Sequence, residues 1–280
     1  MHYTTTELQD LLVIARQVVG DAEQLLSDGR PAQVHAKGVR DMVSDVELAV
    51  EQRIRDALRA ATPHIGFLGE ELGGDADDTA TRWILHPVDG TANFIRNLPL
   101  CGISLALVDG LTPRIGVIHL QYLGRRYWAA SGLGAWRDGT PIRPSAVTDL
   151  SQAMVTIGDA GAGAHADERN RVSLRLHAHL ADHAQRVRLL GSSAVDLAFV
   201  ADGTVDASIT FGNRAWDMAA GAVIAREAGA AVMDIDGSDH TTASRATIAT
   251  APGLRDAILA VLAAATAGSR YTPDQVRSGR

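Results

Sequence analysis

The sequence has 280 residues, 46% hydrophobic but only 4% aromatic, and a formal net charge of −7. A chain of this length can bury a largely aliphatic core, as one large domain or as two packed ones. The negative charge argues against a nucleic-acid-binding protein. Cys101 is the only cysteine, which excludes an intramolecular disulfide and favours a reducing compartment. We see no signal peptide and no apolar run long enough to span a membrane, so we expect a cytoplasmic protein without membrane contact.

Two amphipathic helices are expected at the start of the chain. Apolar residues recur at helical spacing over residues 6–26 and again over residues 44–61. Ser44 and Glu47 have the spacing of a capping box at the start of the second helix. We expect an extended link between the two helices. A short buried strand over residues 65–68 follows them.

The middle of the chain is rich in predicted strands. Strands over residues 102–108, 114–121 and 125–130 indicate an antiparallel sheet, one face of which the two helices can cover. From about residue 145, predicted strands and helices alternate, which indicates an α/β half. We therefore predict an N-terminal α+β half over residues 1–144, a C-terminal α/β half over residues 145–267, and a disordered polar tail over residues 268–280.

The most informative stretch runs over residues 83–94 and reads WILHPVDGTANF. Its apolar start at residues 83–85 predicts a buried strand. We expect this strand to end at Pro87, because proline cannot donate a hydrogen bond to a neighbouring strand. Thr91 or Asn93 can cap a short helix that begins next to the turn.

This strand end also predicts an anion site. Backbone N–H groups of Gly90 and Thr91 at a helix start favour a phosphate group. The carboxylate of Asp89, directly beside them, would repel phosphate unless a cation lay between the two. The stretch therefore predicts a phosphate site that is bridged by a metal ion.

Three further carboxylates could contribute, although each has a simpler explanation when it is taken by itself. Glu70, in Gly-Glu-Glu at residues 69–71, could be a solvated loop residue. Asp217, in Trp-Asp-Met-Ala-Ala-Gly at residues 216–221, could be an ordinary carboxylate in the first turn of a helix. Glu47 could serve only its capping box.

The order of these motifs along the chain resembles that of the inositol monophosphatase family, which makes a chance match improbable. The resemblance covers roughly residues 5–266. It implies a layered αβαβα sandwich of the inositol monophosphatase and fructose-1,6-bisphosphatase type, of mixed α+β and α/β class. Members are metal-dependent, lithium-sensitive phosphatases of sugar and polyol phosphates. The implied cofactor is two or three Mg²⁺ ions, and the implied reaction is direct attack by a metal-bound water without a covalent enzyme intermediate.

The resemblance also implies roles for individual residues. Glu70 would bridge the metals and hold the attacking water, and Asp89 would be a central ligand that also faces the substrate. The carbonyl of Val88 and the carboxylate of Asp217 would complete the ligand set.

Two more residues are implied to act on the water. Thr91 would orient it, and Glu47 would support Thr91 from a position where the family has an aspartate. Glu47, Glu70, Asp89 and Thr91 are thus the implied catalytic residues.

His86 departs from the pattern, because the family has a metal-binding aspartate at this position. An imidazole removes one negative charge and a bridging pair of oxygens, and it suits Zn²⁺ or Mn²⁺ better than Mg²⁺. Three interpretations are open. The site keeps a metal with altered preference or weaker affinity; or the protein is catalytically impaired and binds a phosphorylated metabolite or a protein partner; or the histidine is an engineered or incidental change.

The substrate side is implied by a second resemblance, of Gly-Ser-Ser-Ala at residues 191–194 to a turn between strand and helix in the family. Thr210 lies where inositol phosphatases usually have a glutamate that binds inositol, so inositol, histidinol, fructose bisphosphate and other sugar phosphates all stay open as substrates. A nucleotide substrate would need basic residues near the pocket, which residues 159–165 do not supply. The implied substrate-binding residues are Asp89, Gly90, Thr91, Gly191, Ser192, Ser193, Thr210 and Asp217.

The expected partner is a small phosphorylated metabolite. The family is commonly dimeric, so we also expect a homodimer. The apolar segment 101–107 is a candidate interface for it.

Overall fold

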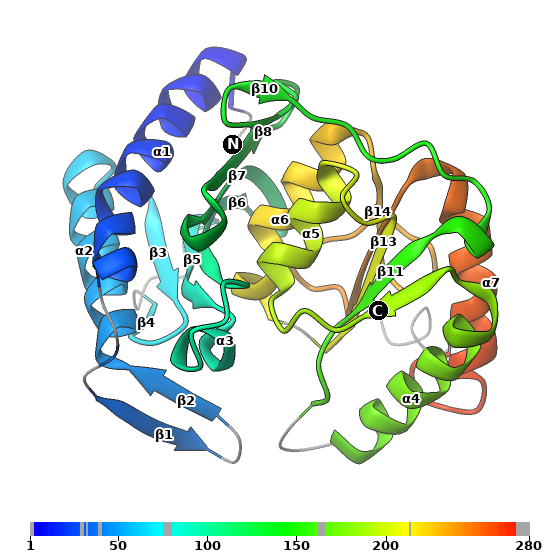
Figure 1. Cartoon of the computed structure of the whole chain (residues 1–280). Coiled ribbons are helices and arrows are strands. Elements are labelled where there is room, and N and C mark those ends of the chain that lie inside the picture. Colours follow the sequence, from blue (N-terminus) through cyan, green and yellow to red (C-terminus); the bar gives the residue numbers. More distant parts are fainter. Residues whose placement is uncertain are drawn as a thin grey trace.

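The computed structural model arranges the chain in five layers of alternating helices and sheets (Figure 1). Helices α1 (Thr5–Asp28) and α2 (Asp45–Ala61) cover one face of an eight-stranded sheet. Helices α5 (Ser193–Ala201) and α6 (Ala215–Ala228) lie between this sheet and a five-stranded one. Helices α4 (Ala166–His183) and α7 (Arg255–Thr266) form the outermost layer. The predicted αβαβα sandwich is therefore confirmed. The structure describes residues 3–28, 31, 33–38, 41–74, 80–161, 166–212 and 214–272.

The eight-stranded sheet has the order β10-β9-β8-β7-β6-β5-β3-β4. Its neighbouring strands are antiparallel except for β3 and β5, which are parallel. The strands are β3 (Gly66–Gly69), β4 (Gly73–Gly74), β5 (Thr81–Asp89), β6 (Gly102–Asp109), β7 (Thr112–Leu120), β8 (Arg125–Ala130), β9 (Ala135–Arg137) and β10 (Thr140–Pro141). The short helix α3 (Thr91–Ile95) follows β5 directly.

The five-stranded sheet has the order β12-β11-β13-β15-β14. Strand β11 is parallel to both of its neighbours, whereas β15 is antiparallel to β13 and to β14. The strands are β11 (Met154–Ile157), β12 (Arg186–Arg188), β13 (Ala207–Phe211), β14 (Ala231–Met233) and β15 (Ala246–Thr250). A separate antiparallel pair, β1 (Val34–Gly38) and β2 (Asp41–Ser44), occupies the link that we expected to be extended.

Small residues let the central layer approach the sheet closely. Helix α6 is buried on nearly all sides, as expected for a helix between two sheets. A Cβ atom at Gly116 on β7 would lie 2.3 Å from the carbonyl oxygen of Ala220 on α6. A Cβ atom at Gly221 would lie 2.5 Å from the Cβ of Leu197 on α5. The low aromatic content of the chain fits this tight packing of Ala, Gly, Val and Leu.

Two predictions about the signature stretch are wrong. Strand β5 does not end at Pro87 but continues to Asp89, with a shift of register against β6 between His86 and Asp89. The first helical residue of α3 is Thr91, and its N-cap is Gly90 in the left-handed region (φ +94°) with no side-chain cap. Neither Thr91 nor Asn93 caps this helix.

Two further expectations also need correction. Segment 101–107 is buried inside this single chain, so it does not offer an interface to a second copy. Residues 268–272 do not fray, because Ser269 and Tyr271 are buried against the C-terminal half. The rest of the expected tail, residues 273–280, lies outside the described residues. Cys101 is buried as expected, and burial raises the pKa of its thiol to about 12.

Candidate active site

The residues singled out in the sequence converge where several elements end. Glu70 follows β3, His86 and Asp89 lie at the end of β5, and Asp217 lies in the first turn of α6. Residues three apart on a regular strand point to opposite faces, since side chains alternate. In β5, Pro87 and Val88 together face the single residue Ile103 of β6, which is a bulge. The bulge lets His86 and Asp89 point toward the same place.

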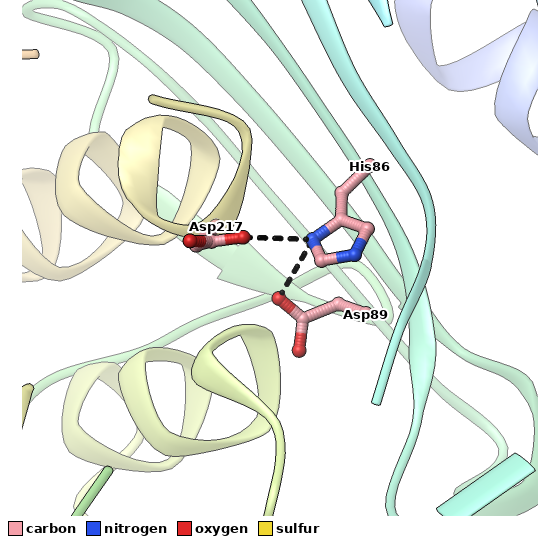
Figure 2. A group of neighbouring side chains, drawn as sticks. All are labelled: His86, Asp89 and Asp217. Atoms are coloured by element: carbon pink, nitrogen blue, oxygen red, sulfur yellow. Dashed lines mark ion pairs between the residues drawn. The ribbon is translucent and has the colours of Figure 1, made fainter. Parts of the chain in front are cut away.

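His86 is the centre of this cluster (Figure 2). Its Nδ1 lies 3.2 Å from Oδ2 of Asp89 and 3.4 Å from Oδ1 of Asp217. Its Nε2 lies 2.7 Å from Oε2 of Glu70. The imidazole is buried, which by itself would lower its pKa, but the carboxylates of Asp89 and Glu70 hold the pKa of His86 well above its ordinary value. The histidine thus stands among three carboxylates.

The carboxylates differ in their charge environment. Burial opposes ionisation of Glu70, but the charges of His86 and Lys37 prevail and lower the pKa of Glu70 to about 2. Loss of contact with water raises the pKa of Asp217 to about 6, although the charge of His86 opposes this shift. Lys37 on β1 also lies 2.7 Å from Oε1 of Glu71, whose pKa burial raises to about 7. Lys37 is a site residue that the sequence analysis missed.

Glu47 and Thr91 form a separate pair beside the cluster. The hydroxyl of Thr91 donates a hydrogen bond of 2.6 Å to Oε1 of Glu47. The other oxygen of Glu47 accepts a bond of 2.5 Å from the backbone N–H of Ser44, so the predicted capping box is present and fixes this carboxylate. Burial raises the pKa of Glu47. Glu47 therefore caps α2 and holds Thr91 at the same time.

The start of α5 supplies the opposite wall. Ser192 caps α5 by accepting from the N–H of Val195 at 3.3 Å, and its hydroxyl also donates a short hydrogen bond to Oδ1 of Asp89. Asn93 donates to the carbonyls of Leu100 and Leu190, each at 2.7 Å, and so joins the two halves of the chain. Serine and asparagine thus hold the two walls of the site together.

A cavity of about 160 Å³ lies between these walls. It is lined by eight of the predicted residues: His86, Asp89, Gly90, Gly191, Ser192, Ser193, Thr210 and Asp217. Glu70 and Asp217 line a neighbouring cavity of about 340 Å³. Glu47, Thr91 and the fully buried Val88 line neither of these two cavities.

The small cavity also contains residues that the sequence analysis did not assign, namely Gly158, Asp159 and Asp196. Asp196 is buried, and burial raises its pKa well above the usual range. Asp196 lies one helical turn after Ser192, so both side chains lie on the same face of α5. This spacing could have indicated Asp196 as a site residue from the sequence alone. Gly158 and Asp159 directly follow β11, and nothing comparable in the sequence marks them as site residues.

The donor atoms at the centre of the site fit a divalent cation. Within the part of the chain that the structure describes, His86, Asp89 and Asp217 each offer one ligand atom, and these atoms lie within 4.8 Å of one another. Nδ1 of His86 and Oε2 of Glu70 are buried, and each has a charged neighbour at ion-pair distance, but none of these contacts between described residues has hydrogen-bond geometry. One nitrogen and several carboxylate oxygens are a donor set that divalent transition metals accept.

A sandwich of this kind with a cluster of side chains that could hold a metal ion is typical of a class of metal-dependent phosphatases, and comparison with known proteins agrees. The model of the inositol monophosphatase family matches residues 7–267. The chain therefore belongs to the inositol monophosphatase family.

Individual relatives support the assignment. The chain is 37% identical over 229 residues to the "probable inositol 1-monophosphatase ImpA" of Mycobacterium tuberculosis, covering 82% of this chain and 84% of the relative. It is 33% identical to the "fructose-1,6-bisphosphatase/inositol-1-monophosphatase" of Aquifex aeolicus, with 70% and 73% covered. The crystal structure of the extragenic suppressor protein SuhB from Bartonella henselae superposes with a TM-score of 0.84 at 29% identity, covering 90% and 98%. Among the described residues, no helix has the length and apolar character needed to cross a membrane.

Proposed function

We propose that this protein is a metal-dependent phosphomonoesterase that hydrolyses a small polyol or sugar phosphate by direct attack of water. The observation that supports the proposal most strongly is the group of donor atoms on His86, Asp89 and Asp217, next to a cavity of about 160 Å³. A divalent cation bound there would neutralise the phosphate, lower the pKa of a water and stabilise the leaving alkoxide.

Thr91 and Glu47 would orient the attacking water. Because the Thr91 proton is donated to Glu47, the lone pairs of the Thr91 oxygen are left to accept a hydrogen bond from water. Glu47 is held by Ser44 and does not need to reorganise during the reaction. The longer side chain of Glu47 thus still reaches Thr91, although the family has an aspartate there.

Asp89 would bind the cation and face the alcohol part of the substrate. Ser192 holds one oxygen of Asp89 and His86 lies beside the other, so the carboxylate has one fixed orientation. Gly191, Ser193 and Thr210 line the cavity where the alcohol part would lie. None of these three carries a charge, which suits a neutral polyol.

The two nitrogens of His86 would have different tasks. Nε2 faces Glu70 at 2.7 Å, which leaves Nδ1 to bind a cation together with Asp89 and Asp217. In metalloproteins a carboxylate often holds the ring nitrogen of a histidine that does not bind the metal. Glu70 would then orient His86 instead of bridging two metals. This donor set favours Zn²⁺ or Mn²⁺ over the Mg²⁺ that the family resemblance implies.

An alternative is a catalytically impaired protein that only binds a phosphorylated metabolite or a protein partner. It is favoured by the ion pairs of His86 with three carboxylates, since a protonated imidazole can neutralise the cluster as a cation would. The cytoplasmic location and the homodimer stay predictions. The name of the Aquifex relative keeps bisphosphates among the candidate substrates.

Phosphate release from a panel of sugar and polyol phosphates would test the proposal. The panel contains inositol 1-phosphate, histidinol phosphate and fructose 1,6-bisphosphate, each with Mg²⁺, Mn²⁺ or Zn²⁺, for this chain and for His86→Asp. We expect turnover by this chain with Zn²⁺ or Mn²⁺, and a shift toward Mg²⁺ in His86→Asp. Calorimetric titration of both proteins with each metal gives a readout that does not depend on activity.

Activity in His86→Asp only, with no metal bound by this chain, would support the impaired alternative. If neither protein released phosphate with any of the metals, the phosphatase proposal would be overturned for these substrates.

A further inference from the structure

A third cavity, of about 480 Å³, lies close to the candidate active site and is dominated by arginine side chains. Arg169, Arg245 and Arg270 line it together with Gly212, Ser244 and Tyr271. No carboxylate belongs to this set of described lining residues. The polarity of the cavity is therefore opposite to that of the cluster around His86.

The three arginines come from segments that are far apart in the chain, and local structure holds each in place. Arg245 precedes β15, and its backbone N–H donates to the buried Asp234 at 3.2 Å. Arg270 follows α7, and its backbone N–H donates to Glu168 at 2.9 Å. Hydrogen bonds to carboxylates thus anchor the backbone of two of the three arginines.

Glycines make room for the third arginine. A Cβ atom at Gly161 would lie 1.9 Å from Nη2 of Arg169, and one at Gly212 would lie 2.6 Å from its Nη1. A side chain at either position would push the guanidinium of Arg169 away. The guanidinium of Arg169 can therefore occupy its place only because residues 161 and 212 are glycines.

The accumulated charge points to an anionic ligand. Glu168 lies 3.5 Å from Nε of Arg270 and is an acidic partner of that arginine. Bringing like charges together is unfavourable unless an anion joins them. Guanidinium groups match phosphate oxygens in geometry and bind them through paired hydrogen bonds. Phosphate is thus the group that this cavity fits best.

Gly212 connects the arginine cavity to the carboxylate site. It lines the arginine cavity and also the cavity of about 340 Å³ that Lys37, Glu70, Arg214 and Asp217 border. The two cavities therefore adjoin at Gly212, one lined by arginines and the other in part by Glu70 and Asp217. We propose that the arginine cavity binds a second phosphate group, so that the preferred substrates are small bisphosphorylated sugars or polyols; this rests on the proposed phosphatase function.

The arginines of this cavity are not neighbours in the sequence. Segment 159–165, next to the predicted site, has no lysine or arginine, as expected. The structure supplies them instead from α4, from the residue before β15 and from the segment after α7.

A matched pair of substrates can test the proposal, namely fructose 1,6-bisphosphate and fructose 1-phosphate. We expect kcat/KM to favour the bisphosphate, and Arg245→Gln to lower the value for the bisphosphate by about 10-fold to 100-fold, as for loss of one charged hydrogen-bond partner. The value for the monophosphate should fall much less. Arg188→Gln is the matched control: this exposed arginine lies on β12 and donates to the adjacent carbonyl of Val187.

Binding of fructose 1,6-bisphosphate to the metal-free protein, measured by calorimetry, separates this proposal from the phosphatase function. Binding that weakens in Arg245→Gln but not in Arg188→Gln supports the cavity even if no substrate is turned over. Turnover of both sugars with the same kcat/KM, unchanged in Arg245→Gln, would overturn the cavity proposal and leave the phosphatase function intact. Absence of bisphosphate binding in all variants would also overturn it.

Discussion

The carboxylate site and the arginine cavity lie on either side of Gly212, but their side chains reach them in different ways. His86 and Asp89 are three residues apart on one strand, and Asp217 lies in the first turn of a helix. The arginines of the cavity are separated by 76 positions (169 to 245) and by 25 positions (245 to 270). A site built at element ends leaves a pattern in the sequence, whereas a cavity assembled by packing leaves none.

The two regions also differ in how their charges are balanced. In the carboxylate site, His86 and Lys37 pair with the surrounding acids, so that adding a cation must displace protons or rearrange Lys37. In the arginine cavity, the described lining residues include three arginines and no carboxylate, and Glu168 pairs with Arg270. Variants that damage one region should therefore leave the ligand of the other region bound.

The largest effect is expected for Asp89→Asn, which keeps the shape of the side chain but removes its charge. Asp89 is 2% exposed and contacts both His86 and Ser192. We expect the rate of phosphate release to fall by about 1000-fold, which corresponds to roughly 4 kcal/mol of lost transition-state stabilisation. Binding of fructose 1,6-bisphosphate to the arginine cavity should persist. A variant that keeps most of its turnover at saturating metal would remove Asp89 from the proposed mechanism.

The next effect concerns the wall of the arginine cavity. Tyr271 is 5% exposed, and its ring centroid lies 5.4 Å from that of Phe211. We expect Tyr271→Ala to lower the free energy of unfolding by about 3 kcal/mol, as for other large buried aromatic side chains. It should also reduce the preference for bisphosphates, because the guanidinium of Arg270 lies over the Tyr271 ring, 5.2 Å from its centroid, and would lose this contact.

Urea unfolding and the ratio of kcat/KM for the two fructose phosphates would measure both effects. The control is Tyr122→Ala, since Tyr122 is 42% exposed and donates one hydrogen bond of 2.7 Å to the carbonyl of Leu26. It should cost about 1 kcal/mol and leave the substrate preference unchanged. Equal effects of the two variants on that preference would argue against a role of the wall.

The helices, the strands and their layering follow from hydrophobic periodicity, and most of them could be predicted. The apolar segment 101–107 shows where this reasoning fails. Its consecutive apolar residues suggested an exposed interface, but β6 has helices packed on both faces of its sheet, and such a strand is apolar throughout. The pattern gives burial, but it does not say whether the covering surface belongs to the same chain.

The local rules fail at the site itself, and for identifiable reasons. Pro87 does not end β5, because it lies in the bulge, where the strand needs no backbone N–H to pair with β6. Thr91 and Asn93 do not cap α3, because their side chains already bind Glu47 and two backbone carbonyls. Gly90 caps the helix without a side chain instead. In each case a contact distant in sequence prevails over the local preference.

Thr91→Val tests the pair that orients water, with a smaller expected effect than the loss of a metal ligand. Valine has nearly the shape of threonine but cannot donate to Glu47. We expect kcat to fall by about 100-fold, the lower range for a group that positions a reacting water or proton, with little change in KM. Steady-state kinetics would measure this. Thr81→Val, which removes a hydroxyl bonded to Asp109 away from the site, is the control. An unchanged kcat would mean that water is oriented by other groups.

The smallest effect concerns the loop that carries Arg245. Nε2 of His240 lies 2.9 Å from the hydroxyl of Thr247, and these two residues bracket the loop. Burial, assisted by Arg226, lowers the pKa of His240 from 6.5 to about 4. Between these values the unfolded chain binds a proton at His240 that the folded protein excludes, so this histidine contributes a decrease in the free energy of unfolding as the pH falls from 6.5 to 4.

His240→Gln should remove this contribution, so that from pH 7 to pH 5 the free energy of unfolding of the variant should fall by about 2 kcal/mol less than that of the natural chain. Urea unfolding at both pH values would measure the difference. His177→Gln, at an exposed position on α4, should keep the natural difference. If His240→Gln kept it too, the acid sensitivity would come from other groups.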